Sequence, residues 1–321
     1  MGIADEFSAI SSGVIPEKSR FIMVPQSTAG VEFVGNLMRY AEVENDTTSP
    51  RLLRLGNCEF EFDAASVVYF GTAQMHIKTI QSALRDVFKD TTSSAFRFVL
   101  PSSALTQFES LVPIHAHDGQ SKSQIGFETL LLNGGNSGGD IFPGDLNLKN
   151  NLSFGSYTVR HLSQTISERL RVLCEVFPDQ VKGHLPSVNA SIKSYRRLMD
   201  QKEVSAGKVL LIGCYPSSTD YIALSGGFSL KTISFETRAD TDRVYFAHEV
   251  LRRLSDSEFK DCPVFVYGHS ISPELMDFLE NDFGKNISLL NPGPLVNLDQ
   301  GRFEKGFPIQ AFVPCLGASI E

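Results

Sequence analysis

The stretch VLLIGCYPSSTDYIALSGG, residues 209–227, decides the fold. Two apolar runs flank a short segment rich in proline, serine and threonine, and a Gly-Gly pair follows the second run. This pattern predicts two strands joined by a turn at Ser217, Ser218 and Thr219. Backbone N–H groups of such a turn can cradle an anion, although serine and threonine form turns without any ligand. The segment therefore has the outline of a phosphate-binding hairpin.

A second stretch near the start of the chain has a similar order. FIMVPQSTAGVEFV, residues 21–34, also runs from apolar residues through proline and Ser-Thr to a second apolar run. We predict a hairpin over 21–37, followed by a strand at 51–63 and a helix at 76–90. After the hairpin at 209–227, a strand and then a helix are again expected. This weak internal repeat predicts a duplicated α/β fold with two lobes around a cleft.

The remaining elements are predicted from periodicity and from start and stop signals. Strands are expected at 95–101, 231–236, 262–268 and 286–292. Helices are expected at 102–111, 159–177, 187–199, 240–254 and 272–284. The segment 133–151 is predicted to be a Gly/Asn-rich loop, and the tail 307–321 a helix kinked by Pro314.

Composition restricts the class of protein. The chain has 321 residues, of which 42% are hydrophobic and 21% charged, as in ordinary globular proteins. A net charge of −8 argues against a general nucleic-acid binder, which would carry a basic face. The N-terminus lacks the basic start and apolar core of a signal peptide, and no apolar run is long enough to span a membrane. The five cysteines form no C-x-x-C pair. We expect a cytoplasmic protein without direct membrane insertion.

In the order of these elements, the chain resembles the actin-like ATPase superfamily. Residues 95–113, AFRFVLPSSALTQFESLVP, look like the segment in which a strand ends in Leu-Pro before a small inserted subdomain, 1C. Residues 262–292 look like the adenosine-side strand, glycine, capped helix and strand ending in Asn-Pro. Within the superfamily, the chain is most similar to the PilM family of type IV pilus assembly proteins, with the cytoplasmic domain of GspL as a near relation.

The resemblance implies an α/β fold of the duplicated actin-like (ribonuclease H-like) type, with two lobes around a cleft. The expected divisions are a flexible lead-in at 1–19, domain 1 at 20–200 with an inserted subdomain at about 94–158, and a shortened domain 2 at 201–321. The segment between the strands at 231–236 and 262–268 has room for one helix, so the 2B subdomain is expected to be reduced or absent.

Active members of the superfamily carry Asp-x-Gly in each phosphate hairpin, to position magnesium and to let the backbone approach phosphate. Leu211, Ile212 and Gly213 occupy the second motif, and Met23-Val24-Pro25 stands near the first. Leucine cannot ligate Mg²⁺, which takes oxygen donors. The resemblance therefore predicts a pseudo-ATPase with no catalytic residue, no metal and no required cofactor, in which ATP binding is possible but not favoured. The vestigial nucleotide cleft would comprise Gly213, Ser217, Ser218, Thr219, Gly268, His269 and Ser270.

The function implied by the resemblance is that of a scaffold or adaptor in a type IV pilus or related secretion assembly. Such a protein would capture a short N-terminal peptide of an inner-membrane partner in a groove on domain 1, and be recruited to the inner membrane by it. Two other functions stay open: a divergent ATPase or small-molecule kinase of the same superfamily, and a metabolite- or carbohydrate-binding module. His115 and His117 share one face of an extended segment and are a candidate metal pair, but an exposed loop is the favoured interpretation.

Overall fold

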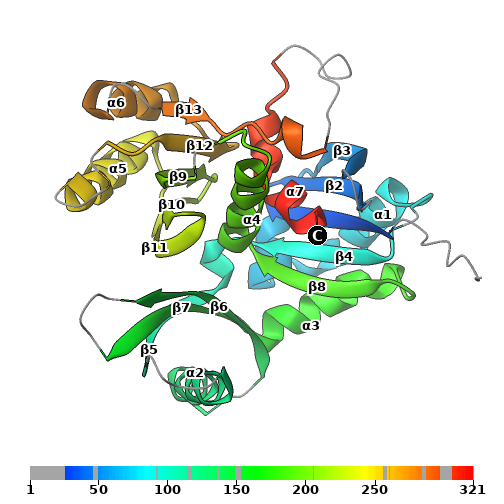
Figure 1. Cartoon of the computed structure of the whole chain (residues 1–321). Coiled ribbons are helices and arrows are strands. Elements are labelled where there is room, and N and C mark those ends of the chain that lie inside the picture. Colours follow the sequence, from blue (N-terminus) through cyan, green and yellow to red (C-terminus); the bar gives the residue numbers. More distant parts are fainter. Residues whose placement is uncertain are drawn as a thin grey trace, which may run out of the picture.

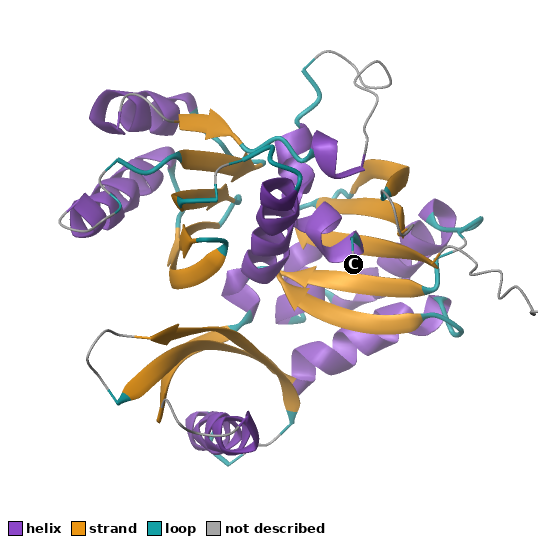
Figure 2. Ribbon diagram, viewed as in Figure 1, coloured by secondary structure: helices purple, strands orange, loops and turns teal. Residues whose placement is uncertain are grey.

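The computed structural model describes residues 26–45, 50–91, 93–113, 118–135, 138–148, 153–204, 206–255, 259, 261–283, 287–296 and 306–320. These residues form three β-sheets with helices packed on and between them (Figures 1 and 2). The first strands are β1 (Gln26–Val34), β2 (Leu37–Asn45), β3 (Arg51–Glu59), β4 (Ala95–Leu100), β5 (Thr106–Pro113), β6 (Gly139–Leu148), β7 (Phe154–Ser163) and β8 (Val181–Pro186). The others are β9 (Lys208–Cys214), β10 (Ser218–Ser225), β11 (Phe228–Glu236), β12 (Val264–Gly268) and β13 (Ile287–Leu289).

Helices occupy the connections between these strands. The α-helices are α1 (Ile77–Val87), α2 (Asp118–Leu132), α3 (Gln164–Leu173), α4 (Ser187–Asp200), α5 (Asp240–Ser255), α6 (Pro273–Phe283) and α7 (Val313–Ser319). The short helices are η1 (Ser66–Phe70), η2 (Gln74–His76), η3 (Ser102–Ala104), η4 (Cys174–Val176), η5 (Gly293–Val296) and η7 (Ile309–Phe312). This alternation confirms the α/β class predicted from the sequence.

Two five-stranded sheets repeat one topology. The first has the order β3-β2-β1-β4-β8 and the second the order β11-β10-β9-β12-β13. In each, three antiparallel strands form a meander and two further strands run parallel to its innermost member. The third sheet, β5-β7-β6, lies between β4 and α3 in the chain and packs with α2. The duplication predicted from the two hairpins is therefore present as two sheets of equal strand order.

The lobes share a central core. Helices α4 and α7 lie between the two five-stranded sheets, as Figure 1 shows. Their side chains pack against Val43 of the first sheet and Leu211 and Ile222 of the second. The outer faces are covered separately, by α1 and α3 on the first sheet and by α5 and α6 on the second. Helix α7, near the end of the chain, thus packs on the sheet formed by the beginning of the chain.

The first hairpin turns at a different place from the one predicted. Strands β1 and β2 are joined by Gly35 and Asn36, and Gly35 has a φ of 58°. Ser27 and Thr28, predicted to form the turn, lie inside β1, where Thr28 pairs with Ala95 of β4. Glycine adopts positive φ without steric cost, and Gly-Asn between two strand-like runs is itself a hairpin signal. The turn prediction at Ser-Thr was therefore wrong; residues 21–25 lie outside the described part.

Other local predictions were also wrong. The segment 102–111 forms η3 and then β5 rather than a helix, and 159–163 belongs to β7 rather than to α3. Helix α2 was missed because its apolar residues do not gather on one face. Strand β6 occupies much of the predicted loop 133–151. Pro314 stands in the first turn of α7, where proline is tolerated, and so begins that helix instead of kinking it.

Candidate functional site

A cavity of about 620 Å³ lies between the turns of the two hairpins. The first lobe contributes Gly35, η1 and the segment Pro101–Ser103 to its wall, and the second contributes Tyr215–Ser218 and Ser234–Glu236. The cleft predicted between the two lobes is therefore present. We call this space the interlobe cavity.

The predicted cleft residues separate into two groups. Ser217 and Ser218 line the interlobe cavity. Thr219 is fully buried behind them, where its hydroxyl lies 3.4 Å from that of Thr237. Gly268 ends β12, His269 and Ser270 follow it, and none of the three lines the cavity. The backbone N–H groups of His269 and Ser270 both donate to the carbonyl of Cys214, at 3.0 and 3.2 Å. Desolvation by the surrounding protein and the charge of Arg39 both lower the pKa of His269.

Gly213 is buried in β9, and its small size has a physical reason. A Cβ atom at this position would lie 2.6 Å from the ring and hydroxyl of Tyr267, on the neighbouring strand β12. The Tyr267 ring, fully buried, thus packs against the α-carbon of Gly213. Leu211, interpreted from the sequence as the replacement of a metal-binding acid, faces the central core between the lobes.

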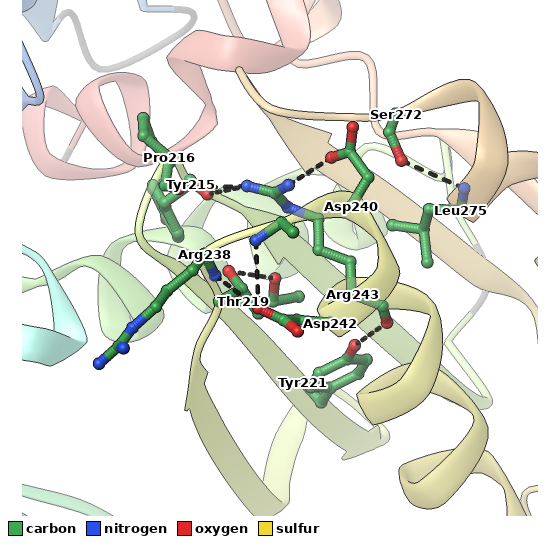
Figure 3. A network of polar contacts seen from close by, with 12 residues as sticks. Tyr215, Pro216, Thr219, Tyr221, Arg238, Asp240, Asp242, Arg243, Ser272 and Leu275 are labelled. Carbon is green, nitrogen blue, oxygen red and sulfur yellow. Dashed lines mark hydrogen bonds and ion pairs between the residues drawn. The ribbon is translucent and has the colours of Figure 1, made fainter.

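An arginine on α5 holds the turn of the second hairpin (Figure 3). Nη2 of Arg243 donates to the carbonyls of Tyr215 and Pro216, at 2.9 and 3.3 Å, and Nη1 donates to Asp240 at 2.5 Å. The guanidinium is almost fully buried, so these charge-assisted bonds act with little competition from water. Arg243 therefore holds the turn through the turn's backbone carbonyls. The sequence of the hairpin gives no sign of this contact, because the arginine comes from α5, the next helix.

Two acids on the hairpins were not assigned to the site from the sequence. Glu32 lies in β1 with no exposed surface, and Nη1 of Arg39 on β2 lies 3.5 Å from its carboxylate. Burial raises the pKa of Glu32 to about 7; the Arg39 charge opposes this shift and the Asp220 charge adds to it. Glu32 thus places an acid in the first hairpin, whereas Met23-Val24-Pro25, assigned to the motif from the sequence, lies outside the described residues.

Asp220 is an acid of the second hairpin and lies in β10. It is fully buried, and the Ser187 hydroxyl donates to it at 3.4 Å. Burial raises the pKa of Asp220, while the hydroxyls of Ser234 and Ser102 and the charge of Arg160 favour its ionised form. The Ser234 and Ser102 hydroxyls do not reach the geometry of full hydrogen bonds. Asp220 therefore lies among polar groups from both lobes, behind the cavity wall.

The described charged residues that line the interlobe cavity are acidic. They are Asp63 and Glu236, and no lysine, arginine or histidine among the described residues lines the cavity. Asp63 accepts from the N–H and hydroxyl of Ser66, and Glu236 pairs with Arg238. Among the described residues, no group of three or more His, Cys, Asp or Glu side chains is placed to hold a metal ion. His115 and His117 lie outside the described residues.

A second concave surface lies between the inserted sheet and the first lobe. Strand β6 ends one sheet and β8 ends the other, and a groove of about 500 Å³ separates them, with α3 along one side. Nδ1 of His184 on β8 lies 2.8 Å from Asp140 on β6 and so joins the two edges. Ile141 and Phe142 contribute apolar surface to the groove, and Arg171, Lys182 and Glu168 contribute charges. We call this the edge-strand groove.

Comparison with solved structures identifies the fold. A structure described as a PilM–PilN type IV pilus biogenesis complex aligns with a TM-score of 0.68 and 15% identity, covering 91% of this chain and 97% of that one. A Bacteroides thetaiotaomicron protein with an actin-like ATPase fold aligns at 0.49 and 13%, covering 91% and 96%. The cytoplasmic domain of EpsL, an inner-membrane component of the Vibrio cholerae type II secretion system, aligns at 0.48 and 10%, covering 91% and 94%. The first of these alignments shows that the chain shares the fold of the PilM–PilN structure, the likeness that the sequence analysis expected.

Comparisons at the level of sequence give no relative. No protein-family model matches the chain, and no curated protein matches it. Within the described residues, none of the helices combines the length and apolar character needed to cross a membrane.

Proposed function

We propose that this protein is an actin-fold adaptor of a type IV pilus or related secretion assembly, and that its edge-strand groove binds a short N-terminal peptide of an inner-membrane partner. The observation that carries the proposal is the groove itself, in which two unpaired sheet edges face each other on the first lobe. The likeness to a PilM–PilN complex supports it.

The groove has the features that an extended peptide requires. Edge strands offer backbone N–H and C=O groups that can pair with an added strand. Ile141 and Phe142 provide apolar contacts for alternate side chains of such a peptide. The charges of Glu168, Arg171 and Lys182 then set its polarity and register. Such binding needs no nucleotide.

Calorimetry with synthetic peptides tests the proposal. The peptides would carry the cytoplasmic N-termini of bitopic inner-membrane proteins encoded beside this chain's gene. Ile141 and Leu146 form a matched pair, because both lie on β6 and both are 39% exposed, but only Ile141 lines the groove. We expect Ile141→Asp to weaken peptide binding at least tenfold and Leu146→Asp to leave it unchanged. Absence of binding by the unaltered protein at high micromolar peptide would overturn the proposal.

We also propose that the adaptor is a pseudo-ATPase. Glu32 is buried against Arg39, Asp220 is buried among hydroxyls, and neither lines the interlobe cavity. Of the described charged residues, a triphosphate in this cavity would meet only the acids Asp63 and Glu236, so that repulsion opposes binding. Titration with ATP in the presence and absence of Mg²⁺ is expected to give no binding heat. Tight, magnesium-dependent binding would instead favour a divergent ATPase or small-molecule kinase.

A further inference from the structure

Arg160 is a buried cation without a counter-ion in contact. It lies in β7 with 2% of its surface exposed. Nη1 donates to the amide oxygen of Asn189 at 3.2 Å, while Nε and Nη2 have no hydrogen-bond partner. Asp220 acts on its charge through space, but no carboxylate among the described residues forms an ion pair with it. A buried guanidinium left in this state is costly, which is why buried charges are normally paired.

Arg160 lines a small polar cavity at the meeting point of three parts of the molecule. The cavity measures about 190 Å³ and is lined by residues of β6, β7, α4 and β11, which come from the inserted sheet, the first lobe and the second lobe. The pairing of β6 with β7 shifts between Pro143 and Leu146, so that Gly144 lies beside the guanidinium. A Cβ atom at Gly144 would be 3.9 Å from Nη1 of Arg160.

Asp145, the acid that lines this cavity among the described residues, already has partners. Asp145 pairs with Nη2 of Arg196 at 2.6 Å, and the same oxygen accepts from the backbone N–H of Ser229 at 2.7 Å. Arg196 also donates to the carbonyl of Gly227 and lies over the ring of Phe228. These contacts balance Arg196 against Asp145. Arg160 is therefore the basic residue of the cavity lining that no described carboxylate contacts, and Asp220 acts on its charge only through space.

We propose that this cavity binds a small oxyanion, held by the guanidinium of Arg160 with Asn189 and Ser229 on the cavity wall. A planar guanidinium offers paired donors that match the oxygens of a phosphate or a carboxylate, and the cavity volume suits a group of that size. Burial lowers the pKa of Arg160 but leaves it charged at neutral pH, as an anion site requires. The bound group would contact both lobes and the inserted sheet at once.

Titration of the full chain with inorganic phosphate and, separately, with acetate at constant ionic strength tests the proposal. We expect saturable binding of at least one of them at millimolar concentration, and the arm that binds distinguishes a phosphate from a carboxylate. Arg160→Met should weaken this binding at least tenfold. Arg169→Met is the control, because Arg169 donates to the carbonyl of Tyr69, away from this cavity, and it should keep the binding.

Thermal unfolding separates this role from a purely structural one. Without either anion, Arg160→Met should unfold at the same temperature as the unaltered protein or higher, since it removes a buried charge that no described carboxylate contacts. Phosphate or acetate should raise the unfolding temperature of the unaltered protein but not of the variant. The proposal is overturned if neither anion binds, if Arg160→Met binds equally well, or if the variant unfolds at a lower temperature in anion-free buffer, as expected for a residue that only balances Asp220.

Discussion

Glu32 is predicted to make the protein less stable as the pH rises through neutrality. Its pKa is about 7 in the folded protein, against 4.5 as the ordinary value, because burial disfavours the carboxylate. Between these values the folded state holds a proton that the unfolded state has lost, so the free energy of unfolding falls as pH increases. This pKa difference of about 2.5 corresponds to about 3 kcal/mol of stability, which is present below pH 4.5 and is lost as the pH rises through 7.

Denaturant unfolding from pH 5 to pH 8 measures this contribution. Glu32→Gln keeps the shape of the side chain but cannot ionise. Its loss of the contact with Arg39 changes the absolute stability, so the slope with pH is the relevant quantity. The unaltered protein should lose about 2.5 kcal/mol more than Glu32→Gln over this range. Glu44→Gln, which removes a carboxylate at the rim of the same sheet, should keep the steeper slope. Parallel profiles of Glu32→Gln and the unaltered protein would refute the reasoning.

Three further substitutions test the second lobe by thermal or denaturant unfolding. Gly213→Ala should lower the free energy of unfolding by about 1–3 kcal/mol, because its methyl group presses against Tyr267, and Tyr267→Leu in the same chain should recover part of this loss. Equal losses with and without Tyr267 would contradict the packing argument. Arg243→Met should cost about 3 kcal/mol because two turn carbonyls lose their donor, whereas Arg252→Met on the exposed face of the same helix should cost less than about 0.5 kcal/mol. Ser272→Ala should cost about 1 kcal/mol by removing the hydroxyl that caps α6 at 3.2 Å, and an unchanged stability would show that the cap is dispensable.

Elements with strong local signals were predictable from the sequence. Helix α6 has a capping serine, a proline at its first position and an apolar face, and these signals fixed it within a residue. The strands of the hairpin β9–β10 were predicted correctly from their apolar runs, but Ser218 and Thr219, predicted to form the turn, lie in β10. Helix α2 and strands β6 and β8 were missed because their residues carry no clear period, and pairing with distant strands decides their structure.

The candidate site was predictable only in part. Ser217 and Ser218 do line a cleft between the lobes, as the hairpin pattern indicated. Glu32 was not assigned to the site because the turn of the first hairpin was predicted too early in the chain. Asp220 was not assigned to it because it lies past the turn of the second hairpin, inside β10. Arg160 gave no signal at all, because an unpaired charge is a property of the surroundings of a side chain and not of its sequence.

The sequence alone determined that this chain is a duplicated α/β protein, because two similar hairpins in one chain can be read from local patterns of apolar and turn residues. Tertiary structure alone decided which residues meet. The packing of α4 and α7 between the lobes, the closure of the cavity over buried acids, and the facing edges of β6 and β8 all join segments distant in the chain. Burial and charge at these junctions depend on such long-range contacts, and no local pattern encodes them.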